Sequence, residues 1–151
     1  ARTREYVDAM RAVWRDDVAS FDGEFVRFDA VRVNPKPLRD RRIPIVLGGN
    51  SDAALRRVAR WGDGWYGVNV DSVDAVAERV GLLHGLCREY GRDPAELRLA
   101  VALRELRPAD VRPLAATGVD ELVLLEGPPG NGDVAADWVS ALADQWMAAL
   151  D

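Results

Sequence analysis

The residues best suited to bind a ligand lie where a short apolar run breaks into two glycines, in Pro44-Ile45-Val46-Leu47-Gly48-Gly49-Asn50-Ser51. This pattern predicts a buried strand, a turn, and then a helix from Asp52 to Trp61. Backbone amides at a helix N-terminus lack acceptors within the helix and carry the positive end of its dipole, so they suit a phosphate group. The same pattern is also typical of a plain tight turn between a strand and a helix. The candidate anion-binding residues are Gly48, Gly49, Asn50 and Ser51.

Other reactive groups are sparse in the sequence. It contains no HExxH motif, no Walker loop and no evident nucleophile-base arrangement. Cys87 is the only cysteine and His84 the only histidine, which excludes an internal disulfide and leaves carboxylates alone for a metal site. We therefore expect no metal. We expect His84 at the surface or boundary of a helix and Cys87 to be a small buried hydrophobe.

Composition narrows the class of protein. With 48% hydrophobic and 30% charged residues, the 151-residue chain is typical of a folded globular domain. The net charge of −5 argues against non-specific binding to nucleic acid or to an anionic membrane. No apolar run approaches the roughly 20 residues of a membrane span, and no signal-peptide segment opens the chain, so we expect a cytoplasmic location. Because Ala1 stands in place of an initiator Met, one expectation is a piece of a longer protein.

The first 42 residues are expected to hold one helix and one hairpin. Thr3 can cap a helix that ends near residues 14–16. Residues 21–28 alternate apolar and polar around Asp22-Gly23, which predicts a small hairpin or extended excursion. The prolines of Asn34-Pro35-Lys36-Pro37 then exclude regular structure, because they lack the amide donor.

From residue 44 onward, strands alternate with helices. The predicted strands are 45–47, 65–68, 97–103 and 119–125, and the helices are 52–61, about 72–90, 110–116 and one from about 133. This order predicts an α/β fold with four parallel strand-helix units, and the last strand is apolar enough to be covered on both faces. We expect residues 1–151 to form a single domain without a linker.

Five motifs in order carry a family resemblance. They are Trp14, Ser20-Phe21-Asp22-Gly23-Glu24-Phe25, Pro35-Lys36-Pro37, Pro44-Ile45-Val46-Leu47-Gly48-Gly49-Asn50-Ser51 and Arg60-Trp61-Gly62-Asp63-Gly64-Trp65. The series resembles the bacterial luciferase-like monooxygenase family, and within it the branch of F420-dependent oxidoreductases. That family has a (β/α)8 TIM-barrel fold, and these motifs match its second half. The resemblance implies that the four predicted strands correspond to barrel strands five to eight.

The resemblance also implies a cofactor. In flavin and F420 relatives the equivalent of the turn Gly48 to Ser51 receives the ribityl phosphate, so F420 or FMN is the expected ligand. Some relatives place another hydroxyl in the first helical turn, whereas this chain has Ala53 and Ala54, which predicts weaker phosphate binding. The substrate-polarising residues of the family mostly come from the first four strands. We therefore assign no catalytic residue.

Four strands do not close a barrel, which takes eight strands and roughly 250 residues. An open half would leave two edge strands and an apolar face in water. Two hypotheses follow: the chain is the C-terminal half of a longer oxidoreductase and is inactive alone, or it is a non-catalytic half-barrel that forms a homodimeric structural or small-anion-binding module. An unrelated open α/β protein is a third interpretation. The expected partners are the cofactor phosphate and a second copy at the open sheet edges, with no nucleic acid and no membrane.

Other candidate positions each have a structural and a functional interpretation. The loop over residues 127–132 is a solvent loop or, alternatively, a lid or second phosphate contact. Asp63 is expected to be a turn residue or, alternatively, to have a catalytic role. Trp65 and Tyr66 are expected to pack in the core or, alternatively, to line a cofactor pocket. A basic connector is expected to be solvated or, alternatively, to meet the acidic tail of F420; it consists of Lys36, Arg39, Arg41 and Arg42.

Overall fold

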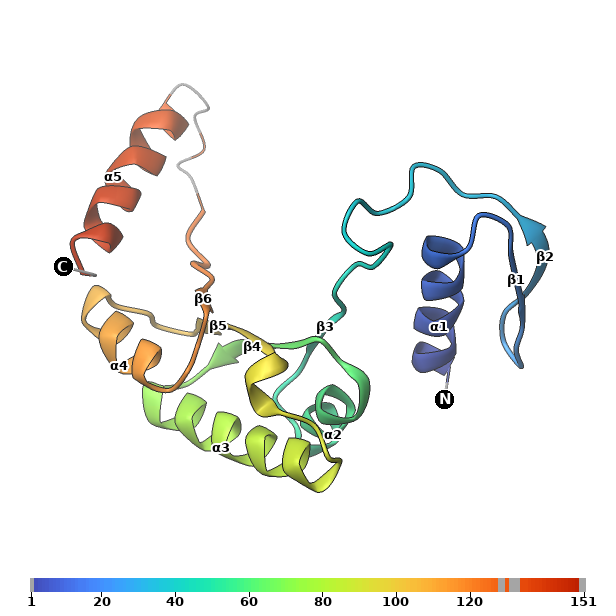
Figure 1. Ribbon diagram of the computed structural model, residues 1–151. Coiled ribbons are helices and arrows are strands. Elements are labelled where there is room, and N and C mark those ends of the chain that lie inside the picture. Colours follow the sequence, from blue (N-terminus) through green and yellow to red (C-terminus); the bar gives the residue numbers. More distant parts are fainter. Residues whose placement is uncertain (1, 128–129, 131–133, 150–151) are drawn as a thin grey trace. The chain divides into compact units, whose positions relative to one another are not determined.

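The computed structural model describes residues 2–127, 130 and 134–149, and the chain divides into two compact units. Unit 1 comprises Ala1–Pro44 and unit 2 comprises Ile45–Asp151 (Figure 1). Each unit is described by itself. The expectation of a single domain over residues 1–151 stays a prediction.

Unit 1 is a helix followed by a hairpin. Helix α1 spans Arg2–Arg15, and the antiparallel strands β1 and β2 span Ala19–Asp22 and Arg27–Val31. The predicted hairpin around Asp22-Gly23 is confirmed. The predicted cap at Thr3 is wrong, because α1 already begins at Arg2 and Thr3 lies within its first turn.

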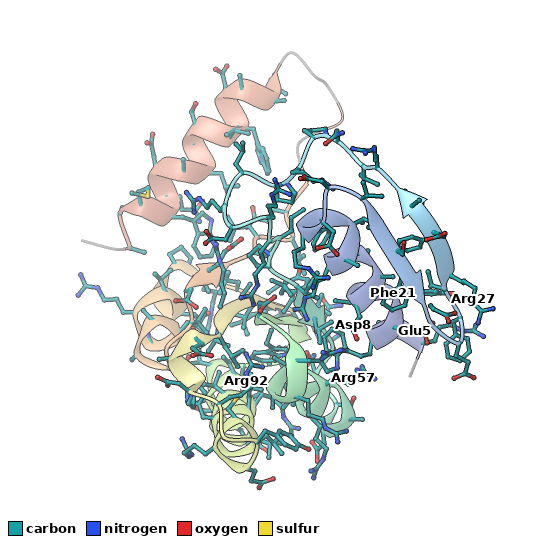
Figure 2. The ribbon with its side chains drawn as sticks, turned by 45° about the vertical axis from the view of Figure 1, so that its right-hand side comes forward. Glu5, Asp8, Phe21, Arg27, Arg57 and Arg92 are labelled. Atoms are coloured by element: carbon teal, nitrogen blue, oxygen red, sulfur yellow. The ribbon has the colours of Figure 1, made fainter. Side chains whose placement is uncertain are left out.

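Glu5 joins α1 to the turn of the hairpin (Figure 2). Its carboxylate accepts the backbone N–H groups of Phe25 at 2.6 Å and Val26 at 2.8 Å. Desolvation alone would raise the pKa of Glu5, but the backbone N–H groups of Phe25, Val26 and Glu24 outweigh it and lower the pKa. Any side chain at Gly23 would overlap this carboxylate, which explains the glycine.

Unit 2 is built on one parallel sheet in the order β3-β4-β5-β6. Its strands are Val46–Gly48, Gly64–Val70, Arg98–Leu103 and Glu121–Leu122. The α-helices are α2 (Asp52–Trp61), α3 (Val73–Glu89), α4 (Val111–Ala116) and α5 (Ala135–Met147). Short 3-10 turns, Pro94–Glu96 and Pro108–Asp110, precede β5 and α4. The predicted α/β fold with four parallel units is confirmed.

The core lies between the sheet and α2, α3 and α4, which Figure 1 shows on the same side of the strands. The amphipathic helices place Leu55, Val58 and Leu83 against Trp65 and Val101 of the sheet, and all five side chains are fully buried. The opposite face of the sheet is largely uncovered in the described part of the chain, where the side chain of Val46 is 44% exposed. Such a face is unusual for parallel strands, which are normally covered on both sides.

Strand β6 is shorter than the predicted strand 119–125. Only Glu121 and Leu122 form ladder pairs with β5, and the Val123 N–H adds one more bond to Val101 O at 2.8 Å. Within the described residues no strand lies on the outer edge of β6, so no second ladder extends it. The expectation that this strand is covered on both faces is wrong here, because Glu121 faces solvent.

Two aspartates tie the amino ends of neighbouring strands together. The Asp63 carboxylate accepts the Ile45 N–H at 2.8 Å, and the Asp120 carboxylate accepts the Leu99 N–H at 2.7 Å. The expectation that Asp63 is a turn residue is confirmed, and Asp120 repeats its arrangement one strand pair further along. Among the described helices, none has the length and apolar character needed to cross a membrane.

Candidate functional site

The turn between β3 and α2 is the candidate site. Strand β3 ends at Gly48 and α2 begins at Asp52, so Gly49, Asn50 and Ser51 make the whole connection. Gly49 has φ +115°, and a Cβ there would lie 3.1 Å from Ala54 Cβ, so this position needs glycine. The turn lies at the carboxyl edge of the parallel sheet, where open α/β sheets bind their ligands.

Strand β4 anchors the turn through three hydrogen bonds. The indole N–H of the fully buried Trp65 donates to Gly49 O at 2.9 Å. The Gly49 N–H donates to Tyr66 O at 3.3 Å, and the Asn50 side-chain amide donates to Val68 O at 2.7 Å. The position of the turn is therefore set by the neighbouring strand.

Ser51 caps α2. Its hydroxyl accepts the Ala54 N–H at 3.3 Å, as expected for an N-cap serine. The side chains of Asn50 and Ser51, predicted as ligand contacts, thus each make a bond within the protein, but the buried Asn50 Oδ1 has no hydrogen-bond partner in the described part of the chain. Gly48 ends β3, and its α-carbon lies on the uncovered face of the sheet.

The turn leaves backbone donors free, in addition to the unpartnered Asn50 Oδ1. In the described part of the chain, no acceptor takes the N–H groups of four consecutive residues, Asn50, Ser51, Asp52 and Ala53. These donors lie at the positive end of the α2 dipole. The Asp52 carboxylate would repel an anion, but Arg79 Nη1 lies 2.8 Å from Asp52 Oδ1 and balances its charge. The arrangement fits a phosphate group bound by amides.

The uncovered face of the sheet forms a hollow of about 350 Å³ that shares Gly48 with the turn. Tyr66 lies in this hollow beside Val46 and Ala100, whereas Trp65 is in the core. Arg98 and Glu121 also line it and pair with each other at 2.7 Å. Of the two aromatic residues considered as pocket-lining, only Tyr66 faces an open space.

The basic connector is only partly solvated. Lys36 Nζ donates to Val13 O and Asp16 O, each at 2.6 Å, so it satisfies carbonyls at the C-terminal end of α1. Arg41 Nη1 donates to Arg15 O at 3.0 Å and pairs with Asp17 at 2.6 Å. These two cations bind the C-terminal end of α1, which gives them a structural role.

His84 and Cys87 lie on α3, away from the carboxyl edge of the sheet. Burial, with help from Arg88, lowers the pKa of half-buried His84, and burial raises the pKa of the fully buried Cys87 thiol. Among residues 2–127, 130 and 134–149, no group of three or more His, Cys, Asp or Glu side chains could hold a metal ion. The predicted loop at 127–132 lies mostly outside the described residues, at Pro128, Pro129, Asn131 and Gly132.

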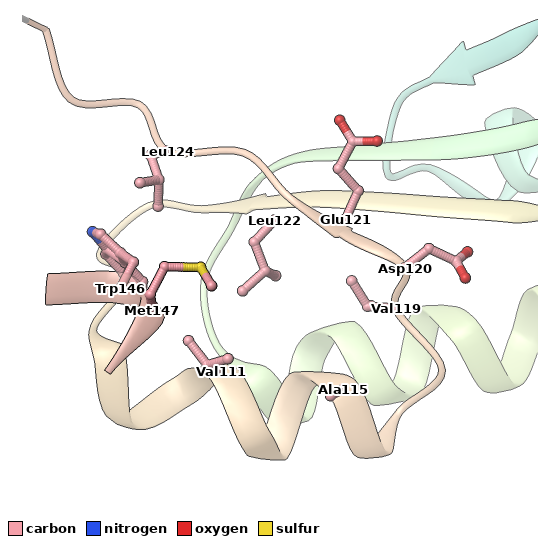
Figure 3. Close-up of a pocket in the computed structure, with 9 residues that line it drawn as sticks. All are labelled: Val111, Ala115, Val119, Asp120, Glu121, Leu122, Leu124, Trp146 and Met147. Atoms are coloured by element: carbon pink, nitrogen blue, oxygen red, sulfur yellow. The ribbon is translucent and has the colours of Figure 1, made fainter. Parts of the chain in front are cut away.

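A second hollow, of about 300 Å³, lies between α4, β6 and the end of α5 (Figure 3). Its lining is mainly apolar and includes Val111, Leu122, Leu124 and Met147. None of the lining residues belongs to the turn, so this hollow is separate from the candidate site.

Sequence reasoning missed Asn69, which has φ +53° near the carboxyl end of β4. The available signal was an Asn following an apolar strand, since Asn tolerates the left-handed region better than other residues with a side chain. It also missed the Arg79–Asp52 pair, because 27 positions separate the two residues and no local pattern connects them.

Comparison with known proteins places this geometry in a family. The family model described as luciferase-like monooxygenase matches residues 1–105. An uncharacterized protein of Mycobacterium tuberculosis is 36% identical over 93% of this chain and 48% of its own length. An FMNH(2)-dependent dimethylsulfone monooxygenase of Pseudomonas putida is 37% identical over 52% of this chain and 22% of its own length. The chain thus spans about half, or less, of the length of these relatives.

The fold agrees with solved structures. The F420-dependent tetrahydromethanopterin reductase of Methanopyrus kandleri superposes with a TM-score of 0.56 at 18% identity, over 66% of this chain and 28% of the reductase. At this identity the likeness concerns the fold alone, which is that of part of a luciferase-like TIM barrel. Sequence motifs, the parallel sheet and the family match agree, and the chain belongs to the luciferase-like monooxygenase family.

Proposed function

We propose that this chain is the C-terminal half of an F420- or FMN-dependent luciferase-like oxidoreductase and that its turn Gly48 to Ser51 binds the phosphate of the cofactor. The observation that carries the proposal is the run of four free backbone N–H groups, Asn50 to Ala53, at the N-terminus of α2. Relatives that depend on FMNH(2) and fold neighbours that depend on F420 supply the cofactor class. When bound, the cofactor supplies the redox chemistry, and this chain holds and orients it.

We expect no turnover from this chain alone. The turn offers backbone donors but no acid-base side chain, and the relatives are about twice as long or longer. Because no turnover is expected, the chain's contribution is tested by ligand binding. A cytoplasmic location belongs to the same proposal.

The test is a fluorescence titration of the chain with F420, FMN and riboflavin, which is FMN without its phosphate. We expect FMN to bind about tenfold more tightly than riboflavin, because charge-assisted hydrogen bonds to phosphate are stronger than neutral ones. Equal affinities for FMN and riboflavin would contradict a phosphate turn. No binding of either FMN or F420 would contradict the proposal as a whole.

Ala53→Glu isolates the role of the amides. Ala53 is exposed in the first turn of α2, where an added carboxylate stabilises the helix by roughly 0.3–1 kcal/mol but repels a phosphate. We expect about tenfold weaker FMN binding, unchanged riboflavin binding and an unchanged or higher melting temperature. Ala77→Glu is the matched control, because it adds the same charge at an exposed position on α3 and leaves the turn unchanged.

A second candidate function is a homodimeric half-barrel that serves as a structural or small-anion-binding module. It is favoured by the uncovered sheet face and by the open edges of β3 and β6 in the described part. Size-exclusion chromatography with light scattering tests it, and a monodisperse monomer would refute it. Val46→Lys on the uncovered face should dissociate the dimer, whereas Leu82→Lys on the exposed side of α3 should not.

A further inference from the structure

Strand β4 carries an irregularity close to the candidate turn. Its register with β5 is regular from Gly64 to Gly67 and then shifts before Val70. Asn69, within this shift, adopts φ +53°, in the left-handed region that side chains rarely adopt. Bulges of this kind occur at barrel rims and beside active sites, where they redirect a side chain.

This irregularity is next to the turn. The Asn50 side chain donates to Val68 O at 2.7 Å, and Val68 O belongs to the peptide group that joins Val68 to Asn69. Asn69 therefore directly follows the carbonyl group through which β4 holds the Asn50 side chain.

The Asn69 side chain is exposed and makes no hydrogen bond within the described part of the chain. A primary amide offers two N–H donors and one carbonyl acceptor, whereas the amides of the turn only donate. The two groups are suited to different chemistry. The turn suits a phosphate, and the Asn69 amide suits a hydroxyl group, which both donates and accepts.

We propose that Asn69 binds the hydroxylated chain that adjoins the phosphate of the ligand held at Gly48 to Ser51. The inference rests on the proposed function, since it takes the phosphate site at the turn as given. The bond from Asn50 to the carbonyl that precedes Asn69 favours the hydroxyl groups nearest the phosphate over a more distant ring. Asn69 is then a specificity residue that distinguishes a phosphorylated polyol from phosphate itself.

The competing interpretation is that Asn69 is there only because Asn tolerates a positive φ. Asn69→Gly separates the two, since glycine adopts this backbone readily and removes the side chain. We expect FMN affinity to fall about tenfold, as for the loss of a hydrogen-bonding side chain. The concentration of inorganic phosphate that half-saturates the chain should not change. The melting temperature should not fall.

Ala30→Gly is the control, because Ala30 has a nearly identical φ of +52° in unit 1. It should leave FMN binding unchanged. If Asn69→Gly binds FMN like the parent chain, the role of Asn69 is refuted while the phosphate turn stands. If its affinities for FMN and inorganic phosphate fall together, the side chain supports the turn and the inference is again refuted. If the parent chain binds neither FMN nor inorganic phosphate, the inference and the proposed function both fail.

Discussion

Gly67→Ala tests whether the buried ring of Trp65 positions the candidate turn. A Cβ at residue 67 would lie 2.6 Å and 2.7 Å from Trp65 Cζ2 and Cη2, whereas ordinary contacts begin at 3.4 Å. Trp65 is fully buried and its indole N–H is bonded to Gly49 O, so the ring cannot move without disturbing packing or this bond. Overpacking of this kind costs about 2–3 kcal/mol. Replacing a strand glycine returns roughly 0.5–1 kcal/mol of chain entropy, which leaves a net loss of about 1–2.5 kcal/mol.

The assay is urea unfolding followed by far-UV circular dichroism, which reports the free energy of unfolding and the midpoint. Gly81→Ala is the matched control, because no atom lies within 4 Å of a Cβ at that position and the residue is in the middle of α3. We expect it to stabilise the protein by roughly 0.5–1 kcal/mol, since alanine is the better helix former. The same chemical change should therefore have opposite signs at the two positions.

Gly67→Ala should also weaken FMN binding, because a displaced indole shifts the Gly49 carbonyl and with it the amides of the turn. Riboflavin binding measures the contribution that does not involve phosphate. A Gly67→Ala protein at least as stable as the parent chain, with FMN affinity unchanged, would refute the packing of Trp65 against Gly67 and its role in positioning the turn.

Three further predictions concern other parts of the chain. The pKa of Glu5 is lowered from 4.5 in the fold, so the stabilising effect of its carboxylate is complete above pH 4.5 and is lost as the pH falls through the lowered pKa. The protection of the Phe25 amide from hydrogen exchange, relative to the unfolded chain at the same pH, should therefore fall on acidification, and Glu5→Gln should abolish this pH dependence. Asp120→Ala should lower the free energy of unfolding by about 1–3 kcal/mol, because the Leu99 N–H loses its acceptor; a change below the error of urea unfolding would contradict this. Cys87 should resist iodoacetamide at pH 7.5 and react rapidly in urea, because burial raises the pKa of its thiol, and fast alkylation of the native protein would show that α3 is not packed as described.

The order of elements could be predicted from the sequence because it depends on local patterns. Helix α2 spans Asp52–Trp61 as predicted, since Ser51 caps it and its apolar positions repeat at helical spacing. The ladder of β6 could not be predicted, because the apolar run 119–125 gives no information on whether a neighbouring strand is available. Only Glu121 and Leu122 find ladder partners.

The candidate site divides in the same way. The sequence by itself determined that a strand ends in two glycines before a helix N-terminus, and its ordered motifs identified the family. Only the tertiary structure decided which groups remain free, because Asn50 Nδ2 and the Ser51 hydroxyl bond within the protein, whereas Asn50 Oδ1 and the backbone amides of the turn stay unpaired in the described part of the chain. Likewise, Trp65, Arg79 and Asn69 are distant from the turn in sequence. Pairing of β4 with β3 positions Trp65 and Asn69, and packing of α3 on α2 positions Arg79. Local patterns fix short-range conformation, whereas which donors stay unpaired depends on contacts between distant segments.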